Sequence, residues 1–251
     1  QVVQTLSKGI ALEKLQSIGV GYSQGMVDIM PIRVEANIIS NPYLNYGYYL
    51  APIFMIMGVI IFTILTTIYA IGRELRYATA KEWMTSAQDS LLGGLVGKLL
   101  PITLTMTLIT QLIYGVLFII MGMECQGSYI YLSLATVVFI IAYQAVGLLF
   151  ISLTANMRLA LSLGGGYGVM AITFSGITFP TIAMYGVAYG ASKLFPLTYF
   201  SEIFIDQAMR GVPIAEDNSR MVCLMLFVII IPISWHRLRR VIINDKYWGR
   251  E

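Results

Sequence analysis

The 251-residue chain is 57% hydrophobic and only 12% charged, with a mean hydropathy of +0.76 and a formal net charge of +3. Soluble globular proteins carry roughly 25% charged residues, so this composition excludes an ordinary soluble enzyme and favours a membrane protein. A single histidine, His236, and two cysteines, Cys125 and Cys223, exclude most zinc sites and most histidine-based catalysis. The two cysteines fall in different predicted elements, and we do not expect them to pair.

Residues 1–47 have the character of a soluble segment. Apolar side chains recur at helical spacing in residues 6–18, which predicts a short amphipathic helix. Residues 32–38 alternate between apolar and polar side chains, which is typical of a half-buried strand. We interpret 1–47 as the C-terminal end of an α/β domain, with a disordered arm as the alternative.

Residues 48–236 contain five apolar segments that are long enough to cross a hydrocarbon core of about 30 Å. These predicted spans cover residues 48–71, 99–123, 129–153, 159–177 and 217–235. Pro101 is expected at the start of the second span, where its missing N–H is harmless. Gly164-Gly165-Gly166 in the fourth span would let neighbouring helices approach closely. The sequence therefore predicts an α-helical polytopic membrane protein.

Lysine and arginine residues gather on one side of these spans. Segment 73–98 and the tail 237–251 hold most of them, and Arg158 lies in a turn on the same side. Because loops rich in Lys and Arg stay in the cytoplasm, we expect this side and the C-terminus to be cytoplasmic, and 1–47 to be extracytoplasmic. The chain begins at Gln1 without an initiator Met or a signal peptide, so we expect that its true N-terminus and a sixth span are missing.

Two segments between the spans are not plain turns. Segment 73–98 is charged and amphipathic over a length that suits a surface for a soluble partner. Segment 178–214 is rich in aromatic residues and proline and only moderately polar, which indicates an extracytoplasmic re-entrant or interfacial helical hairpin.

The predicted spans lack the residues that most transport and hydrolytic chemistry uses. No Asp, Glu, Lys, Arg or His occurs in residues 51–72, 99–122, 126–156 or 159–192. Ion-coupled transporters usually carry an ionisable residue within the membrane. The stretch Gly93–Lys98 is similar to a phosphate-binding loop, but Leu92 and Leu99 stand where that motif needs Gly and Ser or Thr. We interpret Lys98 as a snorkelling anchor, so energy for transport would come from another protein.

Several short motifs occur in an order that resembles a known family. They are Asn41-Pro42, Gly72-Arg73-Glu74, Thr79-Ala80-Lys81-Glu82-Trp83, Gly97-Lys98-Leu99-Leu100-Pro101, Phe174–Pro180 and Phe195–Phe200. Over roughly residues 41–240 the chain resembles type-2 ABC transporter permeases, specifically an N-terminally truncated member of the drug-efflux type with a large periplasmic domain. Ala78 stands where that family commonly has Gly, and Arg76 where an acidic residue is frequent.

The resemblance implies the function of the chain and its partners. It implies a multi-pass permease subunit of the bacterial inner membrane that exports amphipathic or apolar, drug-like or lipid-like molecules, as in multidrug efflux. A separate cytoplasmic ATP-binding subunit would hydrolyse ATP, and the permease would form a homodimer or a heterodimer with a second permease. Membrane lipid and, in some members, a periplasmic membrane-fusion protein are further partners. No cofactor, metal, catalytic residue or nucleic acid is implied. An ion-coupled secondary transporter and a non-transporting membrane scaffold or sensor are the alternatives.

The resemblance also assigns two sets of candidate residues. The ATPase-coupling surface would comprise Arg73, Glu74, Thr79, Lys81, Glu82 and Trp83, with charged ends meeting the ATP-binding subunit and Trp83 anchored at the lipid interface. The alternative is an ordinary solvated loop. The extracytoplasmic gate candidates are Phe179, Pro180, Glu202 and Asp206, with a packed cap as the alternative. Arg158 and His236 are expected to be anchors at the membrane edge.

Overall fold

The structure, a computed structural model, describes residues 46–176 and 184–249 together with the isolated positions 13 and 17. The predicted helix at 6–18, the predicted strand at 32–38 and the gate candidates Phe179 and Pro180 therefore lie outside the described residues, apart from the two isolated positions in the helix.

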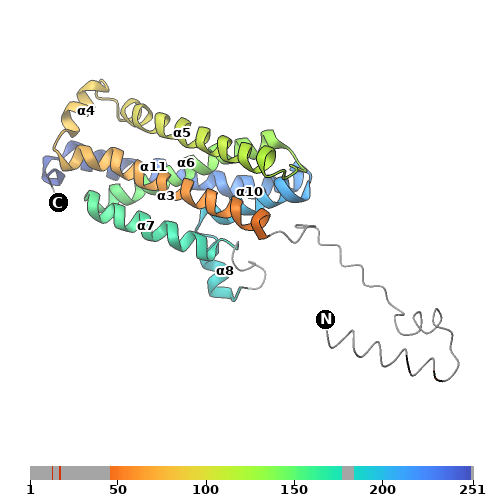
Figure 1. Cartoon of the computed structure of the whole chain (residues 1–251). Coiled ribbons are helices and arrows are strands. Elements are labelled where there is room, and N and C mark those ends of the chain that lie inside the picture. The colour runs from red at the N-terminus through yellow and green to blue at the C-terminus, as the bar shows by residue number, and fades with distance from the viewer. Residues whose placement is uncertain (1–12, 14–16, 18–45, 177–183, 250–251) are drawn as a thin grey trace. The chain divides into compact units, whose positions relative to one another are not determined.

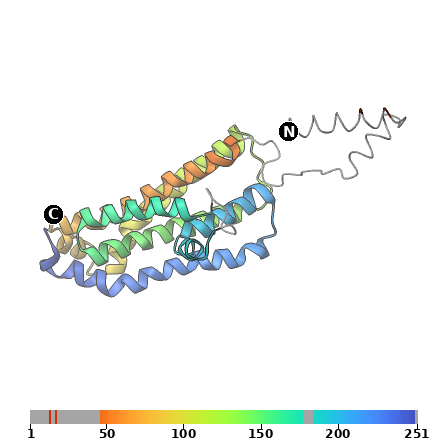
Figure 2. The same ribbon diagram turned by 90° about the horizontal axis from the view of Figure 1, so that it is seen from below.

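Long helices lying side by side make up the described part of the chain (Figures 1 and 2). The elements are α3 (Tyr46–Arg76), α4 (Ala80–Ser86), α5 (Leu91–Gly115) with the π-helical turn η1 (Val116–Ile120), α6 (Tyr129–Thr154), α7 (Met157–Phe174), α8 (Gly186–Ser192), α9 (Pro196–Ile205) with the π-helical turn η3 (Asp206–Arg210), α10 (Ile214–Leu226), the 3₁₀ turn η4 (Phe227–Ile229), α11 (Ile230–Ile243) and the 3₁₀ turn η5 (Asp245–Tyr247). Within these ranges there is no strand.

Within the described ranges, four helices are long and apolar enough to cross a membrane. They are Phe54–Arg76, Leu91–Ile120, Tyr129–Thr154 and Ile214–Ile243. These helices confirm that the chain is an α-helical polytopic membrane protein. The predicted span 159–177 corresponds to α7, which is not among the four; its 18 residues rise about 27 Å along the helix axis.

Three helix boundaries differ from the sequence-based expectation. Pro101 does not open a helix, because α5 begins at Leu91, where the Ser90 hydroxyl caps the helix by accepting a hydrogen bond from the Gly93 amide at 3.2 Å. Helix α3 continues to Arg76, so the first residues of the predicted loop 73–98 are helical. The last span is a continuous helix from Ile214 to Ile243, so the basic residues from 236 to 240 lie on the helix and not after it.

Helix α3 packs against α5, α6 and α7, while α6 contacts α3, α5, α7, α9, α10 and α11 and is the most buried of the four candidate spans. Ile60, Ile64 and Ile68 recur on one face of α3 and are fully buried. A Cβ atom at Gly164 of α7 would lie 2.7 Å from Ile68 Cδ1, which confirms that this glycine permits a close approach of two helices. Gly165 and Gly166 face open space and have no such role.

The two ends of the bundle carry different elements. One end, here called the α4 end, holds α4 and the C-terminal residues 244–249 (Figure 1), and the Gly249 amide donates to the Leu75 carbonyl at 2.9 Å. The other end, here called the α9 end, holds the loop 121–128, the short helices α8 and α9, and the start of α10. Phe200 of α9 stacks on Phe139 of α6 with ring centroids 4.0 Å apart, which inserts α9 into the core.

Candidate functional site

The Glu74 carboxylate, in the last turn of α3, points into the protein and is only 8% exposed as a residue. The Lys98 ammonium of α5 donates to Glu74 Oε1 at 2.5 Å and to the Ala70 carbonyl at 2.9 Å. The Thr79 hydroxyl donates to Glu74 Oε2. One carboxylate therefore ties together α3, α5 and the turn before α4. Lys98, predicted to be a snorkelling anchor, therefore also pairs with a carboxylate.

The turn between α3 and α4 closes the end of α3 with a Schellman motif. The Thr79 amide donates to the Glu74 carbonyl at 3.0 Å, and the Ala78 amide donates to the Leu75 carbonyl at 3.4 Å. Ala78 has a φ of +58°, in the left-handed region that glycine adopts most easily. This explains physically why glycine is favoured at the position where this chain has alanine.

Trp83 of α4 lies against α5. A Cβ atom at Gly94 would be 3.1 Å from the indole ring, and the Lys98 ammonium lies 4.8 Å from the ring centroid in a cation–π contact. Trp83 is half-buried, so it holds α4 on α5 as well as facing outward. This contact adds a packing role to the predicted place of Trp83 in the coupling surface and at the lipid interface.

The structure therefore divides the predicted coupling residues into two groups. Arg73, Lys81 and Glu82 are exposed at the α4 end and are available to a partner. The other three, Glu74, Thr79 and Trp83, make the internal contacts described above and fix α4 relative to α3 and α5. Glu74 is therefore buried and links α3, α5 and the turn before α4, whereas the exposed charges of the predicted coupling surface are Arg73, Lys81 and Glu82.

The C-terminal residues also belong to the α4 end, and no pattern in the sequence predicts this contact. Helix α11 packs against α4. The Trp248 indole N–H donates to the Ile242 carbonyl at 3.2 Å, and the Gly249 amide reaches α3, as described above. Helix α11 therefore contacts α4, and the tail contacts α11 and α3.

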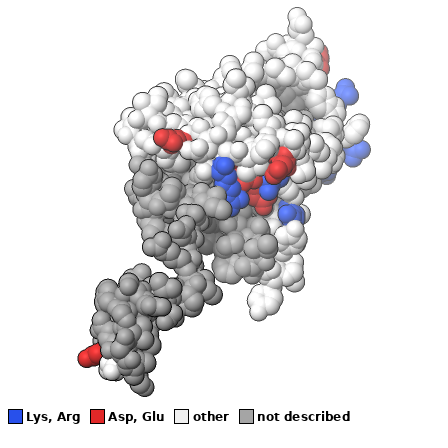
Figure 3. Space-filling view, turned by 90° about the vertical axis from the view of Figure 1, so that its right-hand side faces the viewer, with Lys and Arg blue, Asp and Glu red and all other residues white. Residues whose placement is uncertain are grey.

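A cluster of charged side chains lies at the α9 end (Figure 3). The Arg220 guanidinium of α10 donates to Glu202 Oε2 at 2.9 Å, to Asp206 Oδ2 at 2.6 Å and to Asp217 Oδ1 at 2.5 Å. Asp206 and Asp217 are 4% and 0% exposed. Arg210 donates to the second oxygen of Asp206 at 3.0 Å. One arginine therefore joins α9, η3 and α10.

Gln207 extends this cluster to the loop between α5 and α6. Its amide nitrogen donates to Asp217 Oδ2 at 2.6 Å, while its side-chain oxygen accepts from the Ser128 amide at 2.9 Å. The Gly127 amide donates to the Gln207 carbonyl at 2.8 Å. Gln207, like Asp206, lies on the π-helical turn η3, a feature that is frequent at functional sites.

The gate candidates that can be located, Glu202 and Asp206, are thus brought together by the structure. Sequence reasoning missed Asp217 and Arg220, although their spacing of three residues on a helix was a signal for an ion pair. Cys125 and Cys223 are both free thiols in the structure. Among the described residues, no cluster of His, Cys, Asp and Glu is placed to hold a metal ion.

Comparison with known families agrees with this architecture. A family described as ABC-2 family transporter protein matches residues 1–235. No curated protein and no solved structure gives a significant match to the chain. Because the family match covers most of the sequence, the chain, a multi-pass membrane protein, belongs to the ABC-2 transporter family.

Proposed function

We propose that the chain is the membrane-spanning permease subunit of an ATP-binding-cassette exporter, powered by a separate ATP-binding subunit. The observation that carries this proposal is the way in which α4 is attached to the membrane helices at the α4 end. A short helix, α4, presents the exposed Lys81 and Glu82 and is fastened to two predicted spans by Glu74, Lys98 and Trp83.

These contacts suit the transmission of a movement from a soluble partner to the membrane helices. A displacement of α4 would reach α5 through Trp83, which packs on Gly94, and would reach α3 through Thr79 and Glu74. Helix α3 packs closely against α6 and α7, so its displacement would shift both helices. A solvated loop that lacked these contacts would move without displacing the membrane helices.

The orientation follows from the distribution of charge. The α4 end carries Arg73, Arg76 and Lys81, as well as the basic residues of α11, so it would face the cytoplasm of a bacterium, with the C-terminus on the same side. The α9 end would face outward. Residues 1–47 would then be the end of an extracytoplasmic α/β domain, which is where a membrane-fusion partner would bind.

The α9 end would control the exit of the substrate. Glu202 and Asp206 hold α9 and η3 on α10 through Arg220, so opening this end requires the charge cluster to move as a unit or to separate. Each of the four candidate spans contains a long apolar stretch, which suits an amphipathic or apolar cargo that enters from the lipid. The permease would act as a homodimer or a heterodimer.

The experiment is a mild-detergent purification of the full-length protein from its own cells, with ATPase activity measured on the eluate. We expect an ATP-binding protein to co-purify with the wild type and to be lost when Lys81 and Glu82 are both reversed in charge. Glu124→Lys reverses an exposed carboxylate at the α9 end and serves as the control. An eluate without ATPase, together with transport driven by a proton gradient alone, would replace this proposal with a secondary transporter.

A further inference from the structure

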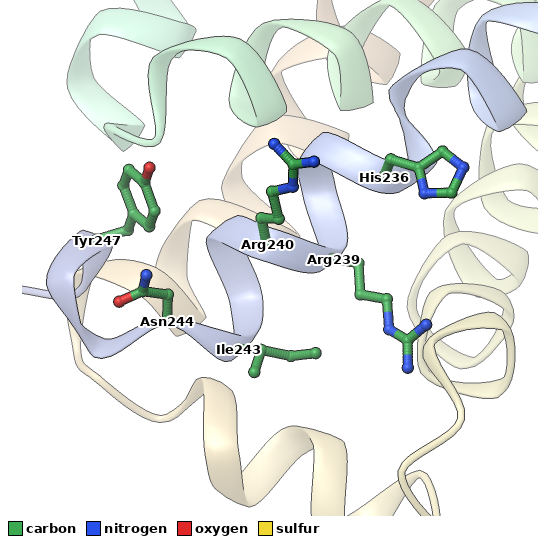
Figure 4. A pocket seen from close by; sticks show the side chains of 6 residues that line it. All are labelled: His236, Arg239, Arg240, Ile243, Asn244 and Tyr247. Carbon is green, nitrogen blue, oxygen red and sulfur yellow. The ribbon is translucent and has the colours of Figure 1, made fainter.

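The last helix carries an open cavity of about 490 Å³ at the α4 end (Figure 4). It is lined by His236, Arg239, Arg240, Ile243, Asn244 and Tyr247. The lining includes one histidine and two arginines, and within the described ranges none of the three forms an ion pair with a carboxylate. Positive charge is therefore concentrated at this cavity, and no acidic side chain within the described ranges pairs with it.

A second, apolar groove of about 400 Å³ lies further along the same helix. It is lined by Val138 and Ile141 of α6 and by Met225, Val228, Ile229 and Pro232 of the last span. The groove lies within Ile214–Ile243, which is long and apolar enough to cross a membrane. A groove between two predicted spans that has an almost wholly apolar lining suits a hydrocarbon chain.

The cavity and the groove lie on one face of the helix. Val228, Pro232, His236, Arg239 and Ile243 follow one another at intervals of three or four residues, which places them in a single row on a helix. From Val228 to Arg239 the helix rises about 17 Å, close to half of a hydrocarbon core of about 30 Å. A molecule with a negative head and a long apolar tail spans this distance.

We propose that this face of α10 and α11 binds one anionic phospholipid. Its phosphate lies in the cavity between His236, Arg239 and Arg240, and one acyl chain lies in the groove between α6 and the last span. The arginines supply charge and directional hydrogen bonds to the phosphate oxygens. The bound lipid would stabilise the contact of α11 with α4 and the tail, and this role does not depend on which molecule the protein exports.

The test uses native mass spectrometry of the full-length protein in detergent, with dioleoyl-phosphatidylglycerol and dioleoyl-phosphatidylcholine as the probes. We expect the wild type to retain phosphatidylglycerol in preference to phosphatidylcholine. Replacing both arginines (Arg239→Gln with Arg240→Gln) should weaken phosphatidylglycerol binding about 30-fold, because each basic residue near an anionic head contributes roughly fivefold. Arg158→Gln removes an exposed arginine from another helix and should leave the preference intact.

A second variant tests the groove separately and does not alter the charge. Val228→Trp fills the apolar groove and should reduce phosphatidylglycerol retention with both arginines present, while Val222→Trp, at an exposed position earlier in α10, should not. Inorganic phosphate added at 50 mM distinguishes a lipid from a free anion.

Three results would overturn the proposal. In the first, the double arginine variant retains phosphatidylglycerol as the wild type does. In the second, phosphate displaces the lipid fully and Val228→Trp has no effect, which would identify a site for a free anion. In the third, no lipid preference exists and the arginine variants instead lose the co-purifying ATP-binding protein, which would identify a protein contact.

Discussion

The ammonium of Lys98 lies 2.5 Å from Glu74 Oε1, and this ion pair joins α3 to α5 at the α4 end. The side chains are 20% and 10% exposed, so the pair is largely shielded from water. This ion pair therefore holds segment 73–98 in a fixed position against the membrane helices.

Breaking this pair on one side should destabilise the protein more than removing both charges. Glu74→Gln and Lys98→Met should each reduce the free energy of unfolding by about 2 kcal/mol, because each leaves a charged or polar group without its partner in a shielded place. The double variant should lose less than the sum of the single losses. Thermal unfolding in detergent, followed by tryptophan fluorescence, measures this cycle, and strictly additive losses would show that the two residues do not interact.

Ala78→Gly should stabilise the protein. Ala78 has a φ of +58°, which is unfavourable by roughly 1 kcal/mol or more for a residue with a Cβ and relaxed for glycine. The greater entropy of glycine in the unfolded chain offsets part of this gain, so the expected net effect is about 0.5–1 kcal/mol. The matched control is Ala80→Gly, within helix α4, which should destabilise by a similar amount. A lower melting temperature for Ala78→Gly would refute the Schellman turn at this position.

Arg220 should be the most sensitive residue of the charge cluster. Arg220→Met leaves Glu202 and the buried Asp206 and Asp217 without their shared cation, which should reduce the free energy of unfolding by about 3–5 kcal/mol. Arg210→Gln removes a cation whose side chain is 47% exposed and should lower it by about 1 kcal/mol or less. Chemical or thermal unfolding of the two variants compares the losses, and equal losses would mean that Arg220 does not hold the cluster together.

The thiol of Cys125 should react slowly at neutral pH. Burial raises the pKa of Cys125 above its ordinary value, and a backbone hydrogen bond from Gly127 opposes this only in part. The folded state therefore holds the thiol proton more tightly than the unfolded state, so this group stabilises the fold at low pH and loses that contribution as the pH rises through the ordinary thiol pKa of about 8.5.

Maleimide labelling in a Cys223→Ser background tests this shift. The rate for Cys125 should rise about tenfold per pH unit from pH 7 and should level off at a higher pH than the rate for N-acetylcysteine. If the two rates levelled off at the same pH, Cys125 would not be shifted.

The sequence was sufficient for the features that depend on local pattern. Helix α6 matches the predicted span 129–153 closely because Ser128 caps its start and a polar turn precedes it. The sequence pattern predicts that this span begins at residue 99, because Pro101 favours a helix start. In the structure, α5 begins at Leu91 under the Ser90 cap. A proline inside a long apolar helix cannot be told from one at its beginning by pattern alone.

The contacts of the candidate site depend on which helices are neighbours. The burial of Glu74 follows from the packing of α3 beside α5, which brings Lys98 to it from a distant part of the sequence. Likewise, Arg220 meets Glu202 and Asp206 only because α9 folds back onto α10. Side-chain partners of this kind follow from tertiary packing and are not encoded in a periodic pattern.

Site-directed crosslinking tests most directly whether α4 is the contact for an ATP-binding subunit. Glu82→Cys, in a background with Cys125 and Cys223 replaced by Ser, places one thiol on the exposed face of α4, and Tyr185→Cys places a matched thiol at a position that is 91% exposed near the α9 end. After treatment of cell membranes with a short bifunctional maleimide, our account predicts a crosslinked ATP-binding protein from position 82 and none from position 185. A crosslink from position 185 with none from position 82 would contradict it.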